Sequence, residues 1–180
     1  EIKPKNYSQE LYIESLQNTI ITFGYGSAGT GKTYLAIYVA ITKLLNNEID
    51  KIVLTRPLVA TEDIGFLPGD INEKIDPYML PLYDAIQSFV GPTKMKQLFD
   101  DGKIEVAALA FMRGRSLNNC FVILDEAENT TKDQIKMFLT RIGYGTTFAI
   151  NGDQSQTDLD TRNENGLTWA IRKLSARTNF

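Results

Sequence analysis

Eight residues near the start of the chain constrain its fold more than any others. Residues 26–33 read Gly-Ser-Ala-Gly-Thr-Gly-Lys-Thr and fit the pattern G-x-x-x-x-G-K-[ST] at every fixed position. The apolar residues before the loop predict a buried strand over 20–25, and those after it predict a helix over 31–46. A strand, a glycine loop and a helix in this order direct backbone N–H groups and a helix N-terminus at one point, where a polyphosphate binds. The alternative is a glycine-rich turn that merely precedes a helix.

Each part of this loop has a physical role in binding a nucleoside triphosphate with Mg²⁺. The glycines let the backbone wrap closely around the β-phosphate, where a Cβ would clash. Lys32 is expected to reach the β- and γ-phosphates, and the Thr33 hydroxyl is expected to ligate Mg²⁺. The expected nucleotide contacts are the loop and the residue directly after it, namely Gly26, Ser27, Ala28, Gly29, Thr30, Gly31, Lys32, Thr33 and Tyr34.

The order of apolar and helical patterns predicts an α/β fold, a mostly parallel sheet of about five strands sandwiched by helices. We expect one domain over residues 1–180, with an insertion over 57–102 between the second and third strands. The predicted strands are 20–25, 51–55, 104–108, 120–125 and 146–150. The predicted helices are 8–17, 31–46, 71–89, 93–100, 131–142 and 163–177.

Composition excludes several kinds of chemistry. The chain contains no histidine, which removes Ser-His-Asp and Cys-His catalysis and the usual zinc sites. Carboxylates, lysine, arginine, hydroxyls and a hard metal such as Mg²⁺ remain. The net charge of −3 does not suggest a coating for duplex DNA, although a local basic groove for a single strand is still allowed. The single Cys120 suits a reducing, cytoplasmic compartment, and no apolar run is long enough to span a membrane.

Two further apolar runs end in polar residues. The run 121–124 leads into Asp125 and Glu126, which predicts a central parallel strand ending at the nucleotide site. Asp125 is expected to hold Mg²⁺, directly or through water, and Glu126 to deprotonate the attacking water. Gln156, after the run 148–150, is a candidate to contact the γ-phosphate or to position that water. The alternatives are two solvated acids at an ordinary strand end and a polar turn.

The segments GSAGTGKT, LDEAEN and NGDQSQ together resemble motifs I, II and III of superfamily 1 helicases. The chain is still more similar to the PhoH-like family, and this resemblance covers about residues 5–175. The matching segments are TYLA at 33–36, TRP at 55–57, IGFLPG at 64–69, AFMRGR at 110–115, DEAEN at 125–129, LTRIG at 139–143, GDQSQTDL at 152–159 and NGL at 165–167.

The resemblance implies a RecA-like P-loop ATPase domain that is cytoplasmic, tied to phosphate starvation or carried by phages, with RNA-related roles. It also implies that Gln9 reads adenine, whereas the alternative is a solvated residue at a helix start. By the same resemblance, the 146–150 strand is expected to lie between the phosphate-loop strand and the 120–125 strand. Two positions depart from the family pattern, because Ser27 replaces a proline and Glu128 replaces a glutamine.

A phosphoryl-transfer site commonly uses one more cation than the loop lysine and Mg²⁺. Arg113, Arg115 and Arg141 are the leading candidates, drawn from a larger set that also includes Arg56, Arg162 and Arg172. The alternative for each is a solvated surface charge. Because one domain has no second domain to close the site, we expect a homo-oligomer in which an arginine from the next subunit completes it. The resemblance favours a hexameric ring.

Three functions remain open from the sequence. The first is an oligomeric, Mg²⁺-dependent ATPase that acts on or with single-stranded RNA or DNA, where basic loops of several copies would sum weak contacts. The second is a nucleotide-binding interaction module that hydrolyses little ATP. The third is a small-molecule kinase, which Glu126 directly after Asp125 disfavours.

Overall fold

The computed structural model describes residues 2–27, 30–57, 71–153 and 164–175, and it contains one parallel sheet. Within these residues the strand order is β1-β5-β4-β2-β3, and all four neighbouring pairs are parallel. The strands are β1 (Ile21–Tyr25), β2 (Lys51–Arg56), β3 (Ile104–Ala108), β4 (Cys120–Leu124) and β5 (Thr147–Gly152). This architecture confirms the predicted α/β fold.

The expected position of β5 is also confirmed. Phe23 of β1 lies opposite Ile150 of β5, and Val122 of β4 lies opposite Phe148 on the other side of β5. Since the C-terminal ends of parallel strands meet at one edge of the sheet, this order places the ends of β1, β5 and β4 side by side. The phosphate loop, Asp125 and the start of the Gly152–Asp153 segment therefore belong to one edge.

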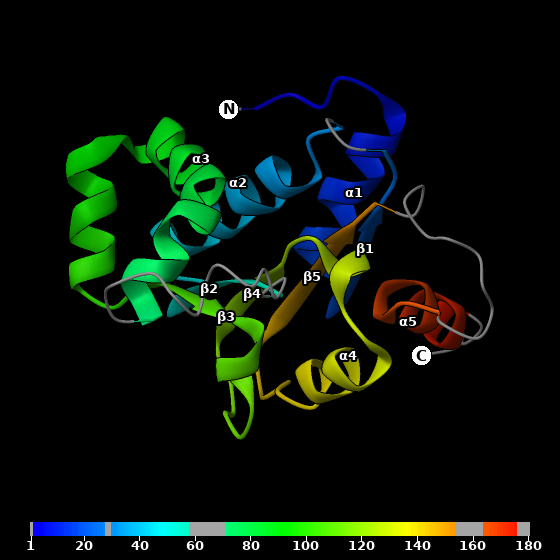
Figure 1. The fold of residues 1–180 in the computed structure, drawn as a ribbon. Coiled ribbons are helices and arrows are strands. Elements are labelled where there is room, and N and C mark those ends of the chain that lie inside the picture. Colours follow the sequence, from blue (N-terminus) through cyan, green and yellow to red (C-terminus); the bar gives the residue numbers. More distant parts are fainter. Residues whose placement is uncertain (1, 28–29, 58–70, 154–163, 176–180) are drawn as a thin grey trace.

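Helices cover both faces of the sheet. One face carries α1 (Tyr7–Asn18), α2 (Lys32–Leu45) and α3 (Ile71–Asp100), and the other carries α4 (Lys132–Leu139) and α5 (Gly166–Ser175) (Figure 1). The short 3₁₀ helices η2 (Leu109–Met112) and η3 (Ala127–Asn129) follow β3 and β4. Among the described residues, no helix has the length and apolar character needed to cross a membrane.

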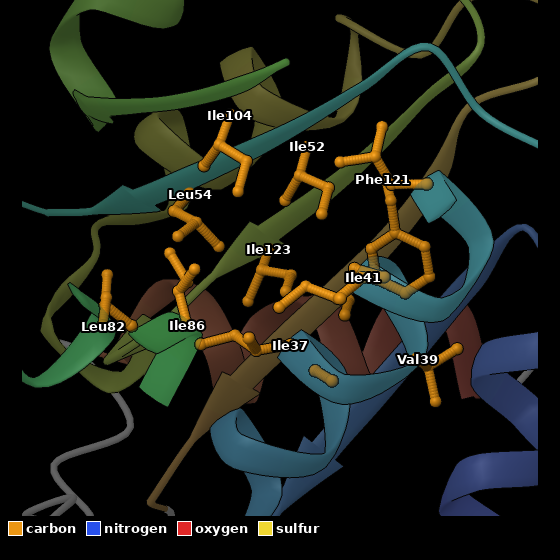
Figure 2. Packing of buried hydrophobic residues seen from close by; sticks show 14 of the residues in the cluster. Ile37, Val39, Ile41, Ile52, Leu54, Leu82, Ile86, Ile104, Phe121 and Ile123 are labelled. Atoms are coloured by element: carbon orange, nitrogen blue, oxygen red, sulfur yellow. The ribbon is translucent and has the colours of Figure 1, made fainter. Parts of the chain in front are cut away.

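The sheet is apolar on both faces, which explains why its strands read as continuous apolar runs. In β4, Phe121 and Ile123 pack with α2 and α3, whereas Val122 and Leu124 pack with α4 and α5. Figure 2 shows the first of these layers, which includes Ile37 of α2 and Ile86 of α3. The core therefore fixes the sheet rigidly beneath its C-terminal edge.

Local signals explain where the helices begin. The Thr131 side chain accepts from Gln134 N while the Gln134 side chain accepts from Thr131 N, a capping box that confirms the predicted start of α4. The predicted helices over 71–89 and 93–100 are confirmed as two helical segments of α3, joined at a kink where Gly91 leaves the helical conformation with φ 80° and ψ 165°. The predicted helix over 131–142 ends earlier, at Leu139, because Met137 O accepts from the Thr140 hydroxyl and from Arg141 Nε, while Arg141 N donates to Phe138 O.

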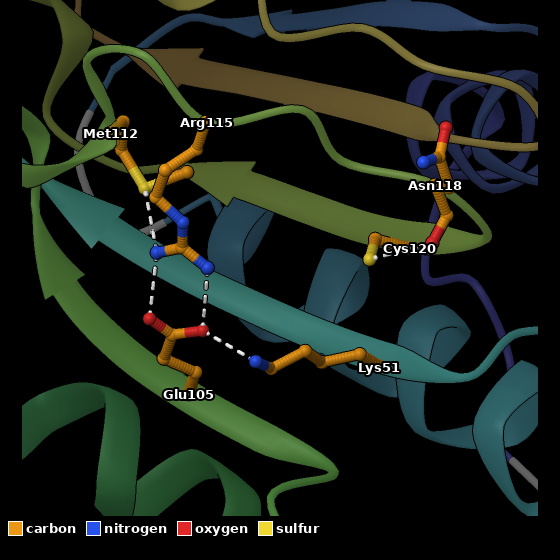
Figure 3. A network of polar contacts seen from close by, with 6 residues as sticks. All are labelled: Lys51, Glu105, Met112, Arg115, Asn118 and Cys120. Carbon is orange, nitrogen blue, oxygen red and sulfur yellow. Dashed lines mark hydrogen bonds and ion pairs between the residues drawn. The ribbon is translucent and has the colours of Figure 1, made fainter.

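Two partly exposed ion pairs that share Glu105 connect β2, β3 and the loop after η2. Both terminal nitrogens of Arg115 donate to Glu105, at 2.7 and 2.9 Å, and Lys51 Nζ lies 2.7 Å from Glu105 Oε2 (Figure 3). The Arg115 guanidinium is the main cause that lowers the pKa of Glu105 from 4.5 to about 2. The carboxylate therefore stabilises the fold fully above pH 4.5, and this contribution is lost as the pH falls toward 2.

We expect Glu105→Gln to lower the free energy of unfolding at pH 7 by about 1–2 kcal/mol, a value reduced for the partial exposure of the pair. The difference from the wild-type protein should shrink as the pH is lowered from 5 toward 3. Urea unfolding at several pH values measures this difference in the free energy of unfolding. Lys96→Gln, in the exposed Lys96–Asp100 pair, is the control and should leave the free energy of unfolding unchanged. A difference that is independent of pH would contradict the assignment.

Candidate nucleotide-binding site

The phosphate loop joins the end of β1 to the first turn of α2, and its own contacts hold it in shape. Gly31 precedes α2 with φ 82°, a left-handed conformation that favours glycine. The Thr30 hydroxyl donates to the carbonyl oxygen of Ser27 at 3.0 Å. Lys32 Nζ donates to the carbonyl oxygens of Gly26 and Ser27, at 3.1 and 2.9 Å. The lysine ammonium thus lies against the loop, where it could contact an anion that the loop binds.

The N-terminus of α2 faces the same point. The first helical hydrogen bond of this turn runs from Leu35 N to Gly31 O, at 2.9 Å. The amide N–H groups of residues 32–34 therefore have no partner within the helix and point out of its end. Together with the helix dipole, they favour a bound phosphate.

The opposite wall of the site is the residue after β4. Asp125 N donates to Thr55 O of β2 at 2.9 Å, which continues the sheet by one residue and fixes the aspartate at its edge. The Thr33 hydroxyl donates to Asp125 Oδ1 at 2.7 Å. The structure therefore brings the two predicted Mg²⁺ ligands into direct contact, although 92 residues separate them in the chain.

These two side chains fit a magnesium ion. Both supply hard oxygen atoms, and Mg²⁺ is commonly held by one or two protein oxygens with phosphate oxygens and water. No group of three or more metal-ligating side chains comes together in the part of the chain that the structure describes. A magnesium ion here would accordingly depend on the phosphates for its remaining ligands.

Arg56, at the end of β2, completes the contacts of the aspartate. Its Nε and Nη2 both donate to Asp125 Oδ2, at 2.9 and 2.6 Å. Its Nη1 lies 3.8 Å from Glu126 Oε1. The arginine is 8% exposed, so a buried cation lies between the two acids that the sequence assigned to metal binding and to catalysis.

The turn after Asp125 has an unusual backbone. Glu126 has φ 55° and ψ 40°, a left-handed conformation that costs a non-glycine residue on the order of 1 kcal/mol or more. The turn leads into η3, where Glu128 Oε2 accepts from Asp153 N at 3.0 Å. Burial is the main cause that raises the pKa of Glu128 above its usual value. Glu128 thus ties the end of β4 to the end of β5 beside the site.

These groups line one cleft of about 500 Å³. It combines the end of the phosphate loop with the acids after β4 and the end of β5. The lining residues include Thr30, Gly31, Lys32, Thr33, Tyr34, Arg56, Asp125, Glu126, Glu128 and Asp153. The cleft brings the described part of the glycine loop, the Thr33–Asp125 pair and the Glu126 carboxylate within reach of one another.

A second cavity of about 710 Å³ lies between α1, β1 and the loop, and shares Thr30 and Lys32 with the first. Gln9 lines it, and Gln9 Nε2 donates to Thr30 O at 3.1 Å while Oε1 accepts from Lys5 N at 2.8 Å. Deeper in the same cavity, the Tyr12 hydroxyl donates to Asn151 Oδ1 of β5 at 2.5 Å. The helix α1 is therefore tied both to the phosphate loop and to the strand at the centre of the site.

The other predicted site residues lie elsewhere or outside the described residues. Arg113 is exposed, Arg115 is engaged by Glu105, and Arg141 donates to Met137 O and to the Thr140 hydroxyl. None of these three arginines lines either cavity of the site. Their assignment as donors to a neighbouring subunit stays a prediction. Ala28, Gly29 and Gln156 lie outside the described residues.

Sequence reasoning named Arg56 only among the wider candidates for an extra cation and Glu128 only as a departure from the family pattern, and it predicted neither the contact of Arg56 with Asp125 nor that of Glu128 with Asp153. The available signal for Arg56 was its position directly after an apolar strand, equivalent to that of Asp125 after β4. For Glu128 it was the third acid in Asp125–Glu126–Glu128 within one turn. Neither signal reveals which strands are neighbours, and the pairing of β2 with β4 decides the contact of Arg56 with Asp125.

The chain is similar over its whole length to known proteins. A family model described as PhoH-like protein matches residues 1–180. A PhoH-like protein of Synechocystis is 52% identical over 167 residues, which are 92% of this chain and 51% of that protein. Protein PhoH of Escherichia coli K12 is 42% identical over 176 residues, or 96% of this chain and 50% of that protein. The chain spans about half the length of these relatives.

Among solved structures, the chain is similar to the Sulfolobus solfataricus SWI2/SNF2 ATPase core in complex with dsDNA. The TM-score is 0.51 at 13% sequence identity, and the match covers 93% of this chain and 35% of that one. This similarity shows the fold, an α/β domain of the kind found in such ATPase cores.

Proposed function

This chain belongs to the PhoH-like family, and from that premise we propose that it binds ATP and hydrolyses it with Mg²⁺. The observation that carries the proposal is the contact between Thr33 and Asp125, at 2.7 Å, beside Lys32 and Glu126 in one cleft. A glycine-rich turn or a solvated strand end would have no reason to bring these four side chains together. The arrangement has the parts that ATP hydrolysis needs.

The chain's own residues divide the reaction between them. The loop and Lys32 hold the β- and γ-phosphates, while Thr33 and Asp125 supply oxygen ligands for Mg²⁺, which offsets phosphate charge when bound. Glu126 accepts a proton from the attacking water, whose oxygen forms a bond to the γ-phosphorus. The bond from that phosphorus to the bridging oxygen breaks, and ADP leaves with the electron pair. The strained turn at Glu126 directs its carboxylate toward the cleft.

Adenine is the base that the site is proposed to select. Gln9 lines the larger cavity beside the loop and already contacts Thr30, so a base in that cavity would lie within its reach. The glutamine amide offers both a donor and an acceptor, which is the pair of groups that adenine presents on its edge. This assignment extends the family resemblance to a residue whose position supports it.

The proposal also includes a homo-oligomer, most simply a hexameric ring, that acts with single-stranded RNA or DNA. One surface feature supports a nucleic-acid role. Phe111 of η2 is 46% exposed, and the exposed Arg113 follows two residues later. An exposed aromatic ring and a cation two residues apart in the chain supply the two kinds of contact that bind single strands, stacking on bases and contact with phosphates. In a ring, several such loops would act together on one strand.

We expect Lys32→Ala to abolish ATP hydrolysis while the protein stays folded, because the substitution removes the charge that holds the β- and γ-phosphates. Phosphate release measured with and without single-stranded RNA tests the proposal, and single-stranded RNA should raise the wild-type rate. Lys96→Gln, an exposed lysine on α3, is the matched control and should retain the wild-type rate. A folded Lys32→Ala protein that hydrolyses ATP at the wild-type rate would disprove the site.

Glu126→Gln should bind ATP and Mg²⁺ about normally and slow the chemical step by roughly 10²–10⁴-fold. The glutamine keeps the size of the side chain and removes the base. Single-turnover hydrolysis of pre-bound ATP separates the two effects. Loss of binding with an unchanged rate for the bound complex would instead make Glu126 a metal ligand.

Light scattering at several protein concentrations, with a non-hydrolysable ATP analogue and Mg²⁺ present, tests the assembly. We expect a mass several times 20.2 kDa, since an arginine from a neighbouring subunit is proposed to complete each site. The number six rests on the resemblance alone. A strictly monomeric protein with full ATPase activity would exclude both the ring and the donated arginine.

A further inference from the structure

We propose that Arg56 is a positioning residue of the ATP site, which holds Asp125 in the orientation that Mg²⁺ requires. The inference rests on the proposed function, because it assigns a role within the same site. It starts from the burial of Arg56, which is 8% exposed at the C-terminal end of β2. A buried guanidinium is costly unless it is paired and hydrogen bonded, so its contacts show what the fold retains it for.

The backbone places Arg56 next to the aspartate before any side chain is considered. β2 pairs with β4 in parallel, with Thr55 opposite Leu124, and the bond from Asp125 N to Thr55 O extends the ladder. Arg56 and Asp125 are therefore equivalent residues at the ends of neighbouring strands. Their contact follows from the register of the sheet, which the core beneath it fixes.

The two oxygen atoms of the Asp125 carboxylate have different hydrogen-bond partners. Oδ2 accepts from Nε and Nη2 of Arg56, and Oδ1 accepts from the Thr33 hydroxyl. Rotation of the carboxylate about its terminal bond would break both contacts, so the arginine locks the oxygen that faces Thr33. That oxygen lies on the side of the phosphate loop, where the metal is proposed to bind.

The charge of Arg56 has a second effect on the cleft. Asp125, Glu126 and Glu128 all line it, and Nη1 of the arginine lies 3.8 Å from Glu126. Acids this close repel one another, and a cation between two of them reduces that repulsion. A lysine would keep the charge but present one point of contact in place of a planar group with donors on two sides. Arg56→Lys is therefore expected to restore the function only in part.

The test compares wild-type protein with Arg56→Gln, Arg56→Lys and, as a control, Lys96→Gln. A fluorescent ATP analogue is titrated in EDTA and again over a range of Mg²⁺ concentrations. In EDTA we expect all four proteins to bind within about 3-fold of one another, because the phosphate loop is unchanged. The Mg²⁺ concentration for half-maximal tightening should rise about 10–100-fold in Arg56→Gln, as for other residues that orient metal ligands. For Arg56→Lys this Mg²⁺ concentration should lie between the values of wild type and Arg56→Gln. For the control Lys96→Gln it should equal the wild-type value.

Steady-state hydrolysis gives the second readout. At saturating Mg²⁺, Arg56→Gln should lower kcat by about 10-fold or more and change KM for ATP less, which a general loss of structure would not do. Wild-type Mg²⁺ dependence in a folded Arg56→Gln protein would overturn the inference. If Arg56→Gln does not fold, the Mg²⁺ dependence of Arg56→Lys is measured in its place. A wild-type Mg²⁺ dependence in Arg56→Lys would then overturn the inference.

The binding titration also separates this inference from the proposed function. A wild-type protein that binds ATP more tightly with Mg²⁺ but hydrolyses none would contradict the proposed hydrolysis. The shift in Mg²⁺ dependence between wild type and Arg56→Gln would still support the role of Arg56. A wild-type protein whose ATP binding does not respond to Mg²⁺ would overturn that role.

Discussion

The site depends on one carboxylate. Asp125 accepts hydrogen bonds from Thr33, in the helix that follows the loop after β1, and from Arg56, the last residue of β2, so it joins three strand ends that are far apart in the chain. The contact requires that β2 and β4 be neighbours and that β5 separate β4 from β1. A different strand order would leave the same motifs intact in the sequence and disperse their chemistry. The parallel sheet is therefore the device that turns separate motifs into one cleft.

The parallel sheet is rigid because both of its faces are buried. Residues of β4 alternate between two apolar layers, and none of its five residues is exposed. A shift of one residue in this strand would exchange the two layers, which the close packing of both resists. Strand ends held this firmly can support strain at the edge, as at Glu126 with its left-handed backbone. The core thus allows the turn that brings the Glu126 carboxylate to the cleft.

The sequence predicted what depends on local pattern and missed what depends on neighbours. Motif spacing located the phosphate loop, Asp125 and Glu126, and the apolar runs located all five strands to within about two residues. The order β1-β5-β4 came from resemblance, since periodicity does not specify which strands pair. The contact of Arg56 with Asp125 and the bond from Asp153 N to Glu128 both cross between strands, and no spacing within one segment encodes them. The helix end at Leu139 was missed because Thr140 competes locally for the last turn.

The charges in the cleft bear on whether a neighbouring subunit must contribute. Among the described residues that line it, Asp125, Glu126, Glu128 and Asp153 face two cations, Lys32 and Arg56. Arg56 is committed to the acids, so its charge offsets theirs and adds little toward the phosphates. The Mg²⁺ proposed to bind here would offset two of these negative charges, but ATP brings further negative charge that is redistributed in the transition state, which is the role proposed for a further cation from a neighbouring subunit. Arg115 would have to abandon two bonds to Glu105, and Arg141 its bond to Met137 O, whereas Arg113 is exposed. Of the three arginines proposed as donors, Arg113 would therefore have to break the fewest contacts among the described residues.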